Sequence, residues 1–145
     1  MRFEASVRID APPARVWEWL RDWSRSSDWM IGTTVEVLSP SGEGVGARTR
    51  AVTRLAGVKL LDVMTVTRWE PQSLIEVRHE RWPLQGLAWF GLAPEGSSAR
   101  VEWVEEITVP FGLLGRIVAR VLRAPVEWGL RTSLKNLKRL VEASS

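Results

Sequence analysis

The sequence predicts an α+β fold in which a curved antiparallel sheet of about seven strands wraps around one long C-terminal helix. Residues from Gly112 to about Glu142 follow a helical pattern, and about 30 helical residues span roughly 45 Å. The stretch before this helix reads as short strands separated by turn residues. The helix is too long to be a connector, so we expect it to lie across the sheet and to leave a central cavity.

The N-terminal segment predicts one strand followed by two short helices. Residues 3–9 alternate between apolar and polar side chains, which is the period of a half-buried strand. Pro12 and Pro13 then end the strand at positions that a first helical turn tolerates. Val16, Trp17 and Leu20 follow at helical spacing, and residues 24–29 are expected to form the second short helix.

The middle of the chain predicts six further strands. Turn-forming residues such as Gly, Pro and Ser separate the apolar runs, and these connections are too short for parallel crossovers. All neighbouring strands are therefore expected to be antiparallel. The predicted strands are residues 33–38, 46–54, 58–69, 74–81, 87–93 and 99–109.

The C-terminal helix carries two apolar stripes that are rotated relative to each other. Pro125 lies between them and is expected to kink the helix, so that both stripes face the curved sheet. Three arginines, Arg116, Arg120 and Arg123, lie opposite the first stripe. Contact with anionic membrane lipid is one interpretation of this basic surface, and a solvated helix face is the expected one. The first stripe is Leu114, Ile117, Val118, Val121 and Leu122, and the second is Leu130, Leu134, Leu137 and Val141.

Composition excludes several classes of protein. The 145 residues suit a single domain covering 1–145, and the absence of Cys excludes disulfides and thiolate ligands. With one His, no multi-histidine metal site can form, and no carboxylate spacing supports a metal site. No phosphate-binding loop or dinucleotide fingerprint is present, so neither a metal nor a cofactor is expected. The net charge is only +3, and no groove-reading motif points to nucleic acid. No signal peptide or membrane-spanning run is visible, so we expect a cytoplasmic protein without stable membrane insertion.

Four motifs resemble the START-like (SRPBCC) superfamily, specifically its polyketide cyclase/dehydrase and lipid-transport family. The resemblance covers essentially the whole chain. It implies a helix-grip (Bet v 1-like) fold and a cavity for a hydrophobic small molecule. The motifs are Ile9-Asp10-Ala11-Pro12-Pro13-Ala14-Arg15-Val16-Trp17 with Trp29, Thr67-Arg68-Trp69-Glu70-Pro71, Ala99-Arg100-Val101-Glu102-Trp103, and Ser133-Leu134-Lys135-Asn136-Leu137-Lys138-Arg139-Leu140.

Strand parity predicts which side chains face the cavity. The family motif implies that Val101 and Trp103 point inward, and Glu105 then shares their face. The same alternation places His79 inward on its strand, so His79 and Glu105 are the two ionisable groups expected to share an apolar pocket. An alternative is that His79 is solvated at the rim while Glu105 pairs with Arg50 or Arg78. The candidate ligand-binding residues are Trp29, Trp69, Val77, His79, Phe90, Trp103, Glu105 and Val121.

Three functions are compatible with these residues. The first is binding or transport of a lipid, polyketide or quinone-like molecule in the cavity, by a monomer or weak dimer. The second is a cyclase or dehydratase in which His79 and Glu105 act as acid and base on a polyketide-like substrate. The third is a co-chaperone-like module that binds proteins, which we disfavour because no large apolar run is expected outside the core. The sequence favours the carrier, because one His and no nucleophile leave the pocket chemically poor.

Overall fold

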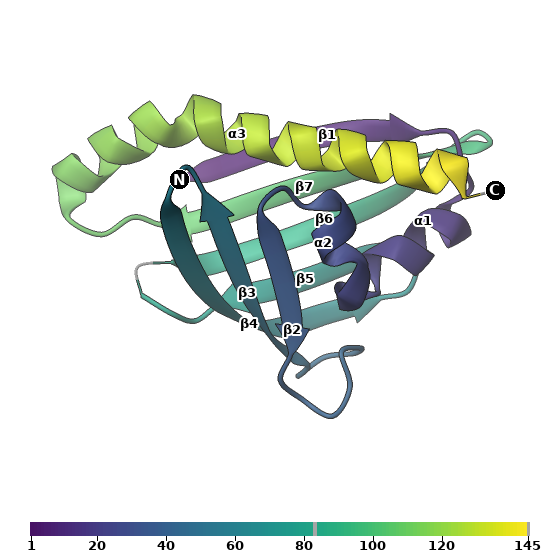
Figure 1. Cartoon of the computed structure of the whole chain (residues 1–145), viewed down its shortest axis with the longest axis horizontal. Helices are drawn as coiled ribbons and strands as arrows, with labels where there is room; N and C mark the ends of the chain where they lie inside the picture. Colours follow the sequence, from purple (N-terminus) through teal and green to yellow (C-terminus); the bar gives the residue numbers. More distant parts are fainter. Residues whose placement is uncertain (83, 145) are drawn as a thin grey trace.

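The computed structural model describes residues 1–82 and 84–144, and a seven-stranded antiparallel sheet forms its centre. The strand order is β1-β7-β6-β5-β4-β3-β2, so β1 joins the sheet beside the last strand (Figure 1). This arrangement confirms the predicted helix-grip fold. The strands are β1 (Arg2–Ile9), β2 (Thr33–Val37), β3 (Arg48–Leu55), β4 (Val58–Glu70), β5 (Leu74–His79), β6 (Gln85–Glu95) and β7 (Ser98–Thr108).

Three α-helices and one 3₁₀ turn complete the described part of the chain. The 3₁₀ turn begins where the Asp22 side chain accepts a hydrogen bond from the Ser24 backbone N–H, which satisfies a donor that the turn leaves free. The short helices α1 and α2 bury Trp17 and Trp29. The elements are α1 (Pro13–Leu20), η1 (Trp23–Arg25), α2 (Ser26–Trp29) and α3 (Gly112–Ala143).

The second half of α3 closes the core, as its apolar stripe predicts. Leu134, Leu137 and Val141 are fully buried and pack with side chains of the sheet, such as Val101 and Ile75, and of α1 and α2. Burying each of these aliphatic side chains contributes roughly 1.5–3 kcal/mol. This packing defines the inner face of the sheet as the face toward α1, α2 and α3.

The first half of α3 does not pack as its stripe predicts. Helix α3 continues through Pro125, but Val121 is 70% exposed and Leu114 is 65% exposed. Ala119 packs instead with Phe3 of β1 and Ile107 of β7, and Gly115 lies against the turn before the helix, where a Cβ would lie 1.7 Å from the Pro110 carbonyl oxygen. The expectation that both stripes face the sheet is therefore wrong for the first. Within the described ranges, no helix is long and apolar enough to cross a membrane.

Candidate functional site

His79 lies between two carboxylates on the inner face of the sheet. Its side chain is buried, and its Nδ1 lies 2.7 Å from Asp62 Oδ2 on β4. Its Nε2 lies 2.7 Å from Glu105 Oε2 on β7. The Trp103 indole N–H donates to the other oxygen of Glu105, at 3.0 Å. We call Asp62, His79 and Glu105 the charged row, since it crosses the sheet from β4 to β7.

The charged row can cross strand β6 because β6 has small residues there. In the strand register, Gly86 lies opposite His79 and Ala88 lies opposite Glu105. Gly86 has a φ of +135°, a conformation that side chains rarely adopt, and an added Cβ would lie 2.0 Å from the Glu106 carbonyl oxygen. Larger side chains at these positions would separate the imidazole from Glu105.

The charged row holds His79 in its protonated form. Burial lowers the pKa of His79, but the hydrogen bonds and charges of Asp62 and Glu105 outweigh it and raise the pKa to about 10. The imidazolium therefore donates a hydrogen bond from each ring nitrogen at neutral pH. With two carboxylates and one imidazolium, the row carries one excess negative charge when both acids are ionised.

Two polar atoms beside the row have no hydrogen-bond partner among the described residues. They are Asp62 Oδ1 and Thr49 Oγ1, and both are shielded from solvent. In the register of β3 and β4, Thr49 lies opposite Met64 and Ala51 opposite Asp62, so Thr49 and Asp62 are diagonal neighbours on the inner face. A buried polar atom without a partner costs about 1–3 kcal/mol, so this end of the row has unused hydrogen-bonding capacity.

Sequence reasoning found His79 and Glu105 but missed Asp62. The predicted inward orientation of both residues is confirmed, and the alternative pairing of Glu105 with an arginine is wrong: Arg50 pairs with Glu36 and Arg78 with Glu80. Strand alternation alone did not predict the orientation of Asp62, because β4 contains a β-bulge where the register with β5 shifts between Val66 and Arg68. The shift reverses the alternation before the bulge and turns Asp62 inward.

The predicted aromatic residues pack against one another on the inner face. Trp29, Phe90 and Trp103 contact each other edge to face, with ring centroids 5.1 to 5.8 Å apart. Trp69 packs in the same manner on Trp17, at 5.3 Å. Trp103 is the member whose indole also borders the charged row. The cluster thus supports the row and fixes the Glu105 carboxylate.

One end of the inner face is uncovered. Leu60 and Val58 share the face of Asp62 by alternation along β4, and Leu55 lies opposite Val58 on β3. Val58 is 66% exposed and Leu55 45%. Apolar side chains therefore lead from solvent along β4 to the charged row, two residues beyond Leu60.

A sequence model of one family matches nearly the whole chain, over residues 1–142, and its description is polyketide cyclase/dehydrase and lipid transport. The chain belongs to this family. The match agrees with the resemblance noted in the four motifs and with the helix-grip fold. A search of curated protein sequences found no match.

Solved structures support the fold of this polyketide cyclase/dehydrase and lipid-transport family member. The chain is similar to TTHA0849 from Thermus thermophilus, with 22% identity, a TM-score of 0.82, and coverage of 100% of this chain and 99% of that one. CV1439 from Chromobacterium violaceum has 21% identity and a TM-score of 0.77, with 98% of each chain covered. The Aha1 dimer from Colwellia psychrerythraea has 15% identity and a TM-score of 0.64, with 98% and 96% covered.

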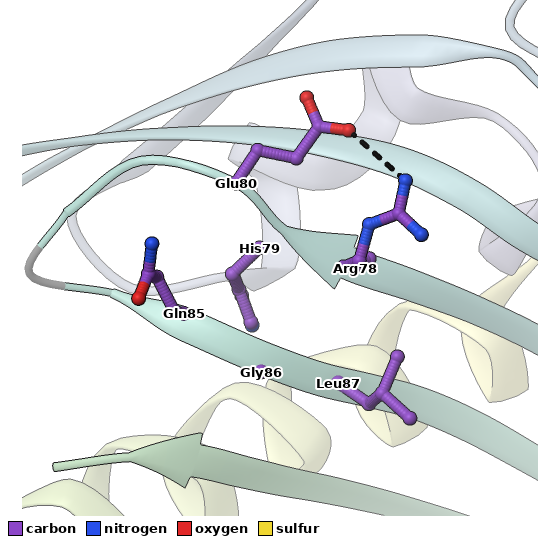
Figure 2. A pocket seen from close by; sticks show the side chains of 6 residues that line it. All are labelled: Arg78, His79, Glu80, Gln85, Gly86 and Leu87. Atoms are coloured by element: carbon purple, nitrogen blue, oxygen red, sulfur yellow. Dashed lines mark hydrogen bonds and ion pairs between the residues drawn. The ribbon is translucent and has the colours of Figure 1, made fainter.

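The candidate residues of this family member do not all meet in one enclosed pocket. Val77 and Phe90 are buried on the inner face, whereas Val121, 70% exposed, lies outside any enclosed space, so its predicted place is wrong. A hollow of about 390 Å³ adjoins His79, lined by Arg78, Glu80, Gln85, Gly86 and Leu87 (Figure 2). Strand alternation puts most of these side chains on the outer face, opposite the row, so this hollow is a surface depression.

Among the described residues of this family member, no cluster of three or more His, Cys, Asp or Glu side chains has a geometry that would hold a metal ion. Both nitrogens of His79 already bind carboxylates. The row can instead accept hydrogen bonds at its carboxylate oxygens, and it presents negative charge beside an apolar surface. This is an environment for recognising a polar group on an otherwise apolar molecule.

Proposed function

We propose that this protein binds a hydrophobic small molecule on the inner face of its sheet, with the polar group of the ligand beside the charged row. The observation that carries the proposal is the row itself, placed next to an uncovered apolar end of the inner face. The family description, which includes lipid transport, agrees with such a ligand.

The energetics of the row favour a role in recognition. Removing ions from water costs several kcal/mol each, and well-packed apolar residues of the same volume would stabilise a fold as well or better. Asp62, His79 and Glu105 are all largely buried, with side-chain exposures of 12%, 5% and 17%. These charged side chains are not needed to pack the sheet, whereas they would bind the polar group of a ligand.

The charge of the row indicates the class of ligand. Two carboxylates share one imidazolium, and Asp62 Oδ1 has no partner among the described side chains. A hydroxyl or ammonium group could donate to these oxygens, whereas a carboxylate would be repelled by them. We therefore expect an amphiphile with an uncharged donor or a cationic group rather than a fatty-acid anion.

A matched series of ligands tests this proposal. Dodecylamine and 1-dodecanol are expected to bind at least roughly 10-fold more tightly than dodecanoate at pH 7.5, which is about 1.4 kcal/mol of discrimination. Titration calorimetry, below the micelle concentrations of the amine and the carboxylate and below the solubility limit of the alcohol, measures the three dissociation constants. Asp62→Asn should narrow the difference between amine and carboxylate, while Asp28→Asn, a carboxylate change on an exposed residue of α2, should leave it unchanged. Equal binding of all three ligands, or preference for dodecanoate, contradicts the proposal.

A cyclase or dehydratase is the second candidate, because His79 Nε2 lies 2.7 Å from Glu105 Oε2. The pKa of about 10 opposes it, since the imidazolium has no free nitrogen to accept a proton at neutral pH. If catalysis is the function, Glu105→Gln should abolish turnover of a polyketide-like substrate and leave its binding nearly intact. For a carrier, the same variant should change binding, and the parent should turn over no substrate.

A further inference from the structure

The first half of α3 exposes an apolar surface that the fold leaves uncovered. We call it the α3 face. Its residues are 46 to 70% exposed, which is unusual for so many large apolar side chains in one place. It overturns the expectation that no large apolar run lies outside the core. The α3 face comprises Phe111, Leu113, Leu114, Ile117, Val118, Val121, Leu122 and Trp128.

Helix geometry shows that this face points away from the sheet. At about 100° per residue, its members occupy roughly half of the helix circumference. Ala119 and Leu130 occupy the opposite side and pack with Phe3 of β1. The beginning of α3 also projects past the strands at one end of the molecule (Figure 1). The α3 face is therefore accessible to a large flat partner.

Basic residues border the α3 face on one side. Arg116 and Arg120 are exposed, and no described carboxylate lies within ion-pair distance of either. Arg123 contacts the Arg2 carbonyl oxygen and Glu127. Glu127, the one acidic residue in α3 before Glu142, also accepts a hydrogen bond from the Glu4 backbone N–H. At Arg116 and Arg120, the exposed border of the α3 face therefore carries positive charge that no described carboxylate neutralises.

We propose that the α3 face docks this protein on the surface of an anionic lipid bilayer, with α3 parallel to the membrane plane. Aliphatic side chains would enter the acyl boundary, and Arg116 and Arg120 would contact anionic headgroups. Trp82 and Phe111, both exposed and packed edge to face, would lie at the interfacial level that aromatic rings prefer. This proposal does not depend on the ligand site at the charged row.

A second copy of the chain fits the α3 face less well. Arg116 and Arg120 border the face, are exposed, and have no ion-pair partner among the described residues. Symmetric pairing would place arginines near arginines with no exposed acid between them, whereas an anionic bilayer supplies both the apolar layer and the opposite charge.

Vesicle flotation tests the docking surface. The parent protein is expected to float with phosphatidylcholine vesicles that contain about 30% phosphatidylserine and to remain behind with pure phosphatidylcholine. Val121→Asp should reduce the bound fraction at least roughly 10-fold. Val45→Asp is the matched control, because Val45 is also 70% exposed but lies in the loop between β2 and β3, so it should float like the parent.

The charge contribution is tested separately. Arg116→Gln with Arg120→Gln should reduce flotation at least roughly 10-fold, and Arg139→Gln, an exposed change in the second half of α3, should not. The proposal is overturned if the parent fails to float on anionic vesicles, or if Val45→Asp loses as much binding as Val121→Asp. It is also overturned if sedimentation shows a dimer that Val121→Asp dissociates while vesicles capture none of the protein.

Discussion

Replacing His79 with alanine is expected to lower the free energy of unfolding by about 3–5 kcal/mol at pH 7. The substitution removes the one cation between Asp62 and Glu105. It leaves two buried carboxylates without a positive partner, and they must stay desolvated or take up protons. Urea denaturation followed by circular dichroism measures the loss.

A neutral row separates this charge effect from the effect of lost volume. In the background of Asp62→Asn with Glu105→Gln, no carboxylate remains to be stranded, so His79→Ala should cost clearly less than in the parent. His79→Ala removes the same imidazole volume in both backgrounds, so the two measurements are matched. Equal costs in both would mean that His79 contributes through packing alone.

Raising the pH from about 7 to 9 is expected to destabilise the protein with a slope approaching 1.4 kcal/mol per pH unit from His79. The pKa of His79 is raised from 6.5 to about 10 in the folded protein. Between these values the folded state keeps a proton that the unfolded state has lost, so unfolding becomes easier as the pH rises. The stabilisation is complete below about pH 6.5 and is lost as the pH passes through about 10.

Denaturation midpoints of the parent and of His79→Gln across pH 6 to 10 measure this contribution. The part of the slope that comes from His79 should disappear in the variant, because glutamine does not titrate. The other groups titrate in both proteins alike, so their contribution cancels in the comparison. A parent whose stability is flat or rises over this range would show that the imidazole is not held as a cation by the two acids.

The fold was predictable because each element has a local signature. The alternation in β1, the Pro12-Pro13 break and the long C-terminal stripe depend on neighbouring residues only. Strand parity similarly predicted that His79 and Glu105 face inward. Strand alternation and helical periodicity extend over several neighbouring residues, so a single sequence is sufficient to recognise them.

Asp62 and the α3 face were not predictable for two different physical reasons. A single extra residue in β4 reverses strand parity, and nothing in the local sequence marks the bulge near Thr67. For α3, periodicity identifies an apolar side of the helix but not the surface that covers it. Ala119 packs on the sheet and Gly115 against the turn before the helix, and such small residues give little hydrophobic signal in the sequence.

A ligand that binds beside the charged row would lie next to the Trp103 indole, which therefore reports on that position directly. Its N–H donates to Glu105 at 3.0 Å, whereas the Trp23 indole donates to the Gly42 carbonyl oxygen at 2.8 Å, outside the row. In a ¹H–¹⁵N spectrum titrated with dodecylamine below its micelle concentration, the Trp103 indole resonance should shift with saturation while that of Trp23 stays in place. Saturable binding that leaves the Trp103 resonance unmoved would contradict binding beside the charged row and place the ligand elsewhere.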